Sequence, residues 1–262
     1  MPIVTVPDGS ELYYEVHGDG PRTIVFSHGA GGNHLSWWQQ VPRYRDEYRC
    51  VTFDHRGFGA STDASDSYIR AYTADLEAIL ADAGVRDAVL VGQSMGGFTC
   101  ITFAAAHPDR VRGLVMADTF LGVGDEPLIA EWREALTAIP TPEDPMRQTS
   151  MVAQSFIEAH PEGLFLYQQV RGTNPPRDLT ADYSVADGAV PTAELPKLTM
   201  PVLFLAGDED AIIPAPLIER ASHLVPGARY EGVPNTGHSV YWERPEAFNA
   251  LLDGLLAEAF GG

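Results

Sequence analysis

Residues 87–97 read DAVLVGQSMGG, an apolar run that ends in a Gly-x-Ser-x-Gly motif centred on Ser94. The apolar run is typical of a buried strand, and the small residues at 97–106 favour a helix directly after it. Between a strand and a helix, this motif is typical of a nucleophile elbow, a turn that lifts the serine hydroxyl clear of the sheet. Gly92 and Gly96 remove side chains that would clash in so tight a turn. We therefore interpret Ser94 as a candidate nucleophile.

Apolar strands alternate with helices over most of the chain, which predicts an α/β fold with a mainly parallel sheet covered on both faces. In such sheets ligands bind beyond the carboxyl ends of the strands, so residues that follow strands are candidates for a site. We expect strands at residues 3–6, 11–17, 23–26, 50–53, 87–91, 111–117, 201–206 and 228–233, and helices at 35–41, 68–83, 97–106, 217–224 and 245–260.

Residues 119–199 interrupt this alternation. No apolar strand is evident in them, and helices are expected near 127–139, 145–159 and 163–170, with proline-rich joints between them. This insertion falls between two strands whose ends carry candidate site residues, so we expect it to lie over those ends. The predicted organisation is a core domain of residues 1–118 and 200–262, with a helical cap or lid at 119–199.

The composition argues against several classes of protein. The 262 residues carry a formal net charge of −19, which repels nucleic acid and anionic membranes. No apolar run approaches the roughly 20 residues of a membrane span, and the first residues lack a signal-peptide pattern, so we expect a cytoplasmic protein. Cys50 and Cys100 have no metal-ligand spacing and are expected to be core residues. The sequence does not reveal the oligomeric state.

A serine hydroxyl needs a base to take its proton, and the base needs an acid to orient it. Of the eight histidines, His238 alone follows a late strand within a glycine-containing loop, so it is the candidate base. Asp210, which follows another strand, is the candidate acid, and Asp118 stays open as a rival because it also ends a strand. The order Ser94, Asp210, His238 is the one expected when the serine stands in a nucleophile elbow.

Attack on a carbonyl also requires two backbone N–H groups that face the developing oxyanion. The N–H of Met95 is one candidate because it begins the helix after Ser94, and helix N-termini favour anions. The second is the N–H of Ala30, in the glycine-rich loop at 28–32. This loop lacks the sequence patterns of phosphate-binding loops.

Five ordered motifs together resemble the α/β-hydrolase family: His28-Gly29, Asp54-x-Arg-Gly-x-Gly59, Gly92-x-Ser-x-Gly-Gly97, Gly207-x-x-Asp210 and Gly237-His238. The resemblance covers nearly the whole chain except the insertion. It implies an eight-stranded sheet with helices on both faces and a cap after the sixth strand, and it supports Asp210 over Asp118 as the acid. It also implies structural roles for His28, Asp54 and Arg56.

These features predict a serine hydrolase that cleaves a small-molecule carboxylic ester or lactone through an acyl-enzyme, with no cofactor or metal. Some aromatic and methionine side chains of the insertion should line an apolar acyl pocket. The candidates are Phe120, Trp132, Met151 and Phe156.

Three alternatives stay open. The first is hydrolysis of a carbon–carbon bond in a diketone, with Arg171 or Arg177 and Trp242 holding an acidic substrate. The second is a cofactor-free perhydrolase or haloperoxidase, in which peroxide replaces water. The third is a receptor that retains the triad and uses the cap as a sensor.

Overall fold

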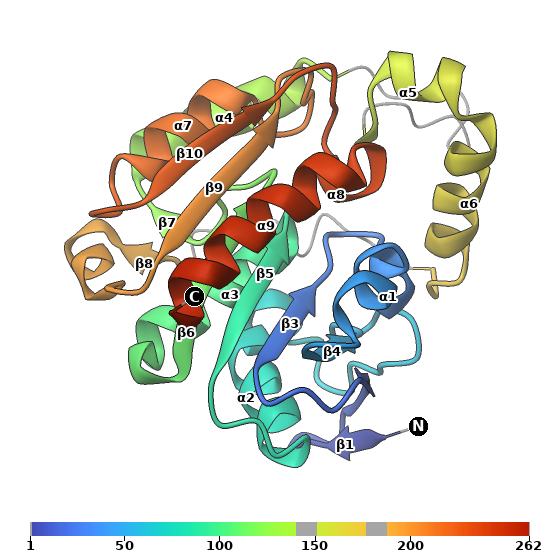
Figure 1. The fold of residues 1–262 in the computed structure, drawn as a ribbon, viewed down its shortest axis with the longest axis vertical. Coiled ribbons are helices and arrows are strands. Elements are labelled where there is room, and N and C mark those ends of the chain that lie inside the picture. The colour runs from blue at the N-terminus through green and yellow to red at the C-terminus, as the bar shows by residue number, and fades with distance from the viewer. Residues whose placement is uncertain (1, 140–150, 177–187, 262) are drawn as a thin grey trace.

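The computed structural model describes residues 2–139, 151–176 and 188–261 of the chain. One eight-stranded sheet has the order β1-β2-β4-β3-β5-β6-β9-β10. β2 pairs antiparallel with β1 and β4, and all other neighbours are parallel, so the mostly parallel sheet expected from the sequence is confirmed (Figure 1). The strands are β1 (Ile3–Thr5), β2 (Glu11–His17), β3 (Thr23–Ser27), β4 (Arg49–Phe53), β5 (Ala88–Gln93), β6 (Val111–Ala117), β9 (Val202–Gly207) and β10 (Arg229–Val233).

Alternation of side chains along the central strands explains why both faces of the sheet are covered. In β3, Val25 belongs to one apolar cluster, and its neighbours Ile24 and Phe26 belong to the other. Figure 1 shows α9 in front of the sheet and α3 behind it. The helices that share the cluster of Val25 include α2 (Tyr72–Asp82), α3 (Met95–Ala106) and α7 (Ala215–Ser222), and those that share the other include α1 (Gln40–Tyr44) and α9 (Pro245–Phe260).

The helix expected at 35–41 is wrong in its extent, because the structure divides this stretch into two short helices. The 3-10 helix η1 (His34–Trp37) begins at a capping box in which the Asn33 side chain binds the first turn. Pro42 lies in the first turn of α1, where its missing N–H costs nothing, so a new helix starts there. The other short helices are η2 (Tyr68–Ala71), η3 (Pro108–Arg110), η7 (Thr192–Lys197) and α8 (Val240–Glu243). None of the helices in the described ranges is long and apolar enough to cross a membrane.

The described part of the insertion contains α4 (Glu126–Thr137), α5 (Gln154–Ala159) and α6 (Pro161–Gly172). The expectation of no strand at 119–199 is wrong, because two-residue strands pair in parallel near its ends, β7 (Val123–Gly124) with β8 (Val190–Pro191).

The helix expected at 145–159 lies partly outside the described residues. Its described part becomes α-helical only at Gln154, because Ala153 is extended, with φ −65° and ψ 148°. In Figure 1, α4 lies beside α7, whereas α5 and α6 lie at the opposite side of the molecule. The division into core and cap stays a prediction.

The parallel strands carry separate stretches of the chain to one edge of the sheet. β3, β5, β6, β9 and β10 run in the same direction and are consecutive neighbours. The segments after their carboxyl ends contain, in chain order, His28, Ser94, Asp118, Asp210 and His238. The residues singled out by the sequence therefore converge at the edge where ligands bind in open α/β sheets.

Candidate active site

Ser94 occupies a strained turn between β5 and α3. Its backbone angles, φ 51° and ψ −121°, lie in a region that residues with a side chain rarely adopt. A Cβ at Gly96 would come within 2.1 Å of the carbonyl oxygen of Ser27, and a Cβ at Gly92 within 2.6 Å of that of Gly96. Side chains are therefore excluded at both glycines, and the turn has the geometry of a nucleophile elbow.

Three side chains from distant parts of the chain form a hydrogen-bonded line. His238 Nε2 lies 2.9 Å from Ser94 Oγ, and His238 Nδ1 lies 2.7 Å from Asp210 Oδ2. The histidine is fully buried, and the serine is 6% exposed. Because a carboxylate only accepts, Asp210 places the proton of a neutral His238 on Nδ1 and leaves Nε2 to accept from the hydroxyl. This is the arrangement of a nucleophile, a base and an orienting acid.

The charges around His238 favour its protonated form. Burial by itself lowers the pKa of His238, but the charge and hydrogen bond of Asp210, followed by the charges of Asp118 and Glu243, raise it, and the net shift is upward. A base of raised pKa takes a proton from an alcohol more readily. Asp210, the carboxylate in contact with the ring, stabilises the imidazolium that the transfer creates.

The loop after β9 directs Asp210 toward the histidine. Asp210 Oδ1 accepts from the backbone N–H groups of Ile212 and Ile213 at 2.8 and 2.9 Å. These bonds engage one oxygen, and the other is the one in contact with His238 Nδ1. The carboxylate is thereby held from both ends, which fixes the orientation of the ring it binds.

Asp118, the rival acid, binds the end of β9 and the segment that follows His238, beside the hydrogen-bonded side chains of Ser94, His238 and Asp210. Its carboxyl group accepts from the N–H of Gly207 at 3.2 Å and from the N–H of Val240 at 3.0 Å. Burial, followed by the charge of Asp210, raises the pKa of Asp118 well above its usual value. The structure therefore brings Asp210 into contact with the candidate base, and it places Asp118 where it joins neighbouring loops.

The loop after β3 sets the direction of the Ala30 N–H. The Gly29 carbonyl accepts from His28 Nδ1 at 2.8 Å and from the N–H of Gly32 at 3.0 Å. The C=O and N–H of one trans peptide point in opposite directions, so these bonds also fix the N–H of Ala30. A Cβ at Gly29 would lie 3.0 Å from the Cβ of Ser94, which places the loop directly against the serine.

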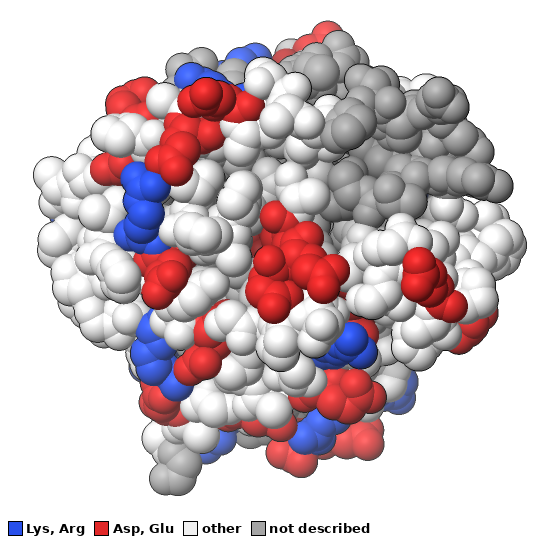
Figure 2. Space-filling model, turned by 90° about the horizontal axis from the view of Figure 1, so that it is seen from above, with Lys and Arg blue, Asp and Glu red and all other residues white. Residues whose placement is uncertain are grey.

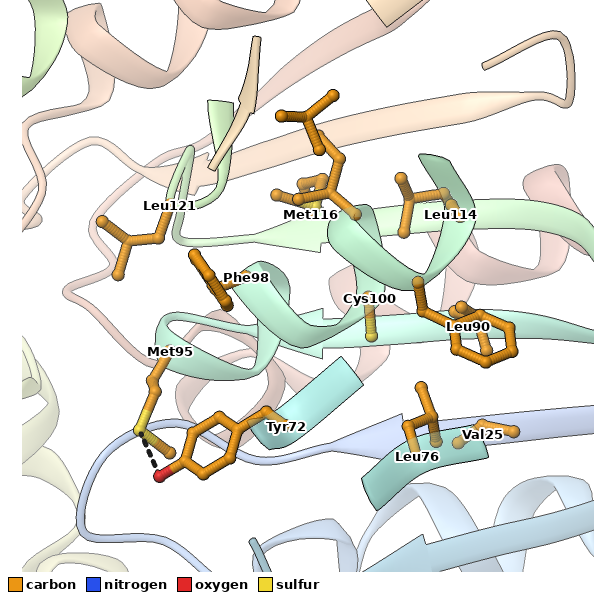
Figure 3. Close-up of a cluster of buried hydrophobic side chains, with 14 of the residues drawn as sticks. Val25, Tyr72, Leu76, Leu90, Met95, Phe98, Cys100, Leu114, Met116 and Leu121 are labelled. Atoms are coloured by element: carbon orange, nitrogen blue, oxygen red, sulfur yellow. Dashed lines mark hydrogen bonds between the residues drawn. The ribbon is translucent and has the colours of Figure 1, made fainter. Parts of the chain in front are cut away.

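The N–H of Met95 is the second candidate oxyanion donor. Met95 is the first residue of α3, where a backbone N–H has no acceptor within the helix. Its side chain is buried, and Figure 3 shows its sulfur facing Tyr72, whose hydroxyl lies 3.8 Å away. Within the described ranges, neither the N–H of Met95 nor that of Ala30 has a hydrogen-bond acceptor. Neither N–H is therefore used within the described part of the protein.

The other motif residues bind parts of the protein around this edge. His28 Nε2 accepts from the backbone N–H of His55 at 3.0 Å. Arg56 forms an ion pair with Asp75 on α2 at 2.5 Å, and Asp54 accepts from two backbone N–H groups, at 2.7 and 2.8 Å. These contacts agree with the structural roles that the resemblance implies for His28, Asp54 and Arg56.

Two of the four expected pocket residues lie together. Phe120 and Trp132 are buried, with ring centroids 6.2 Å apart in a T-shaped arrangement. Trp132 Nε1 donates to the carbonyl of Ile212 at 2.9 Å. Because Ile212 also binds Asp210, this aromatic pair is tied to the loop of the candidate acid.

The other two expected pocket residues lie elsewhere. The Met151 carbonyl accepts from Ser239 Oγ at 2.9 Å, beside the histidine loop. Phe156 lines an outer groove together with Trp38 and Trp242, and no residue of the hydrogen-bonded line borders that groove. A role for Phe156 in the acyl pocket stays a prediction.

Sequence reasoning missed Gln93, whose Nε2 donates to the carbonyl of His238 at 2.7 Å. This bond holds the backbone of the candidate base from the turn that carries the nucleophile. Gln93 is the variable position of the Gly-x-Ser-x-Gly motif, so the pattern gives no signal for it.

Contacts from the end of α6 to the oxyanion loop were also missed. Asn174 Nδ2 donates to the carbonyl of Gly31 at 2.7 Å, and the guanidinium of Arg171 lies against Gly31 with one nitrogen 3.4 Å from the Ala30 carbonyl. Arg177 lies outside the described residues. Because single polar residues at the end of a helix have no distinctive spacing, the sequence did not indicate these contacts.

Acidic side chains are more numerous than basic ones on the face shown in Figure 2, in line with the net charge of −19. Burial raises the pKa of both free cysteines, Cys50 and Cys100, to about 12, so neither is a ready thiolate. Within the ranges that the structure describes, no group of three or more His, Cys, Asp or Glu side chains could hold a metal ion.

The fold and the site define a class of protein. The sequence model of the alpha/beta hydrolase family matches residues 24–251, and the chain belongs to this family. The resemblance drawn from the five motifs is confirmed, and the protein is an α/β hydrolase.

Several individual proteins of known name or structure are similar to this chain. The chain is 29% identical over 261 residues to RutD of Azorhizobium caulinodans, whose name assigns it provisionally to carbamate hydrolysis, and the match covers 95% of this chain and 96% of that protein. A thermophilic esterase from Thermogutta terrifontis, solved with malate bound, has a TM-score of 0.80 and 26% identity over 99% of both chains. Est816, an N-acyl homoserine lactone degrading enzyme, has a TM-score of 0.80 and 27% identity over 97% of this chain and 99% of its own.

Proposed function

We propose that this protein is a serine hydrolase that cleaves a small-molecule carboxylic ester or lactone. The observation that carries the proposal is the line from Ser94 through His238 to Asp210, with contacts of 2.9 and 2.7 Å. A hydroxyl, an imidazole and a carboxylate in this order perform acyl transfer in unrelated folds. The open N–H groups of Ala30 and Met95 support the same chemistry, because acyl transfer develops a negative oxygen.

In the proposed mechanism, His238 takes the proton of Ser94 as its Oγ attacks the substrate carbonyl. The N–H groups of Ala30 and Met95 stabilise the tetrahedral oxyanion. His238 gives the proton to the leaving oxygen as the carbon–oxygen bond breaks, which leaves the acyl group on Ser94; the alcohol of an ester departs, and that of a lactone stays attached to the acyl group. Water, deprotonated by His238, then attacks the acyl-enzyme, and His238 returns this proton to Ser94 Oγ as the acid is released. Asp210 stabilises the imidazolium at both stages.

The substrate class is inferred from similarity and from the apolar surroundings. The similar proteins named above act, by their names, on a carbamate, an ester and a lactone, which all contain a carbonyl with a leaving heteroatom. The buried Phe120 and Trp132 support an apolar acyl group. We further propose that residues 119–199 act as a cap over the strand ends, with Met151 at the edge nearest the histidine loop.

The diketone alternative receives less support from the contacts. Arg171, which would hold an acidic group, already lies against the Ala30–Gly31 backbone, and Trp242 Nε1 donates to the Gly163 carbonyl at 3.3 Å. Perhydrolysis and ligand sensing use the same triad, and the test below separates them from ester hydrolysis.

The test is a panel of nitrophenyl esters, lactones and vinylogous diketones, assayed with the wild type and Ser94→Ala. We expect the wild type to turn over at least one ester or lactone, and Ser94→Ala to lose roughly a thousandfold or more while its circular dichroism is unchanged. Full activity in Ser94→Ala would contradict the mechanism. Faster formation of peracid than of acid in the presence of peroxide would favour perhydrolysis. Thermal stabilisation of the wild type without turnover would favour a receptor.

A further inference from the structure

Glu243 is a buried carboxyl group that the proposed mechanism does not use. It ends α8, shortly after His238 in the chain, and it is 4% exposed. In the part of the chain that the structure describes, it has no ion-pair partner. A carboxyl group so deeply buried is costly unless it is hydrogen bonded, so its partners show what it holds in place.

The first partners of Glu243 flank the candidate base. Its Oε1 accepts from the N–H of Gly237 at 3.1 Å and from the N–H of Ser239 at 3.3 Å, and its Oε2 also lies 3.1 Å from the Gly237 nitrogen. Gly237 and Ser239 are the neighbours of His238 on either side. The carboxyl group therefore fixes the backbone from which the imidazole extends.

The same carboxyl group binds the insertion. Glu243 Oε2 accepts at 2.9 Å from the N–H of Ala153, the extended residue that precedes α5. The two segments pack closely, because a Cβ at Gly237 would lie 2.5 Å from the Ala153 nitrogen. Ser239 Oγ adds a bond to the Met151 carbonyl. One side chain thus joins segment 151–153 of the insertion to the histidine loop at 237–239.

We propose that Glu243 is a positioning residue that couples the docking of segment 151–153 to the orientation of His238. When the segment is docked, the carboxyl group binds all three N–H groups, and the loop holds the imidazole against Ser94. When the segment separates, Oε2 of Glu243 loses its shortest hydrogen bond and keeps only the longer contact to the Gly237 nitrogen, so the carboxyl group and the loop are free to shift. The inference rests on the proposed function of the triad, and it assigns to the insertion a part in aligning it.

Glu243 also acts on His238 through its charge. Burial raises the pKa of Glu243 to about 7 against its backbone hydrogen bonds, and the charge of Asp210 adds to the rise. The charge of Glu243 in turn raises the pKa of His238, beside the larger effects of Asp210 and Asp118. The outer groove beside Glu243 carries four further charged or titratable residues, His160, Glu162, Arg244 and Glu246. Removal of the Glu243 charge should therefore lower the pKa of His238, which a packing role alone would not do.

Three single variants test the proposal. Glu243→Gln keeps the size of the side chain and removes its charge and one acceptor oxygen. Glu246→Gln, at an exposed position on α9, removes the same charge with none of these contacts and is the matched control. Ala153→Pro removes the N–H on the insertion side, at a residue whose φ of −65° suits proline. The double variant Glu243→Gln/Ala153→Pro completes a double-mutant cycle, which measures whether the two changes act independently.

The measurements are the rate at which a fluorophosphonate modifies Ser94 and the pKa of His238 by NMR. We expect Glu243→Gln to slow modification about 10- to 100-fold and to lower the pKa of His238, because a small misplacement of the base has effects of this size. Glu246→Gln should match the wild type. Ala153→Pro should also slow modification, and the double variant should be no slower than Glu243→Gln, because both changes remove the same bond.

Three results would overturn the proposal. These are a wild-type rate and a wild-type His238 pKa in Glu243→Gln, an equal loss in Glu246→Gln, or additive losses in the double variant. If Glu243→Gln does not fold, a wild-type rate of fluorophosphonate modification in Ala153→Pro would also overturn the proposal. Failure of the proposed function is recognised separately, as a wild type that neither reacts with the fluorophosphonate nor cleaves an ester. The NMR titration of His238 needs no turnover and tests Glu243 in that case too.

Discussion

At the scale of residues, hydrogen bonds distinguish the role of Asp210 from that of Asp118. Asp210 and Asp118 both follow strands, and each accepts from two backbone N–H groups. Asp210 has an oxygen in contact with His238, whereas the two oxygens of Asp118 bind the loops beside it. The raised pKa of Asp118 favours its neutral form, which would stabilise an imidazolium poorly. The two residues should therefore respond differently to the same substitution.

We expect Asp210→Asn to lower kcat/KM for an ester roughly 10³- to 10⁴-fold, because the amide neither fixes the tautomer of His238 nor stabilises its charge. Asp118→Asn should stay within about tenfold of the wild type, since an amide resembles a protonated carboxyl group. In pH profiles the acid limb marks protonation of His238, so it should move to lower pH in Asp210→Asn, where the carboxylate that raises that pKa is gone. The opposite ranking of the two variants would transfer the acid role to Asp118.

Whether a site residue could be predicted depends on whether a local sequence pattern marks its position. Ser94 and His238 stand in glycine-containing turns between strands and helices, a local feature that sequence spacing reveals. Gln93 binds the backbone of His238, and Glu243 binds the backbone of Ala153, at separations that no short pattern records. Their roles became visible only when the partners were known.

At the scale of elements, the turn between β5 and α3 shows how packing maintains strain. Ser94 has a positive φ, and the backbone of Ser27 presses against Gly96 from the neighbouring strand. Because Ser27 of β3 pairs directly with Gly92 of β5, the Ser27 side of this contact does not move without breaking sheet hydrogen bonds. The strain at Ser94 is therefore maintained by the sheet itself.

We expect Gly96→Ala to lower the free energy of unfolding by about 1–3 kcal/mol or more, because its Cβ would lie 2.1 Å from a backbone oxygen. Ester turnover should fall as well, since relief of the clash moves Ser94. The matched control is Gly254→Ala in the interior of α9, where a Cβ meets nothing within 4 Å. That change should stabilise by about 0.5–1 kcal/mol. Urea unfolding gives the free energy of unfolding of Gly96→Ala and of Gly254→Ala. Equal values for the two variants would contradict the account.

The ends of the elements were harder to predict than their types. Periodicity located the strands and the long helices, because burial on the sheet sets that pattern. It did not locate the break between η1 and α1, which depends on the Asn33 cap, or the start of α5, which depends on Ala153 and its bond to Glu243. In both places a side-chain contact decides where the helix begins.

At the scale of the whole molecule, the topology of the sheet brings the site residues together. Parallel strands bring the segments that follow them to one edge, so the serine, the acid and the histidine meet although they are far apart in the chain. The strand–helix alternation was sufficient to predict this convergence. The sequence did not show that the insertion binds two of the converging loops, through Asn174 at the oxyanion loop and through Ala153 at the histidine loop.

The central claim, that Ser94 is a nucleophile activated by His238, is tested most directly by covalent trapping. The wild type, Ser94→Ala and His238→Ala are treated with a fluorophosphonate, digested, and mapped by mass spectrometry. We expect one adduct in the wild type, on the peptide that contains Ser94, and none in Ser94→Ala. His238→Ala should react at least about a hundredfold more slowly, because the hydroxyl has lost its base. An adduct on another residue, or equally fast reaction without His238, would contradict the account.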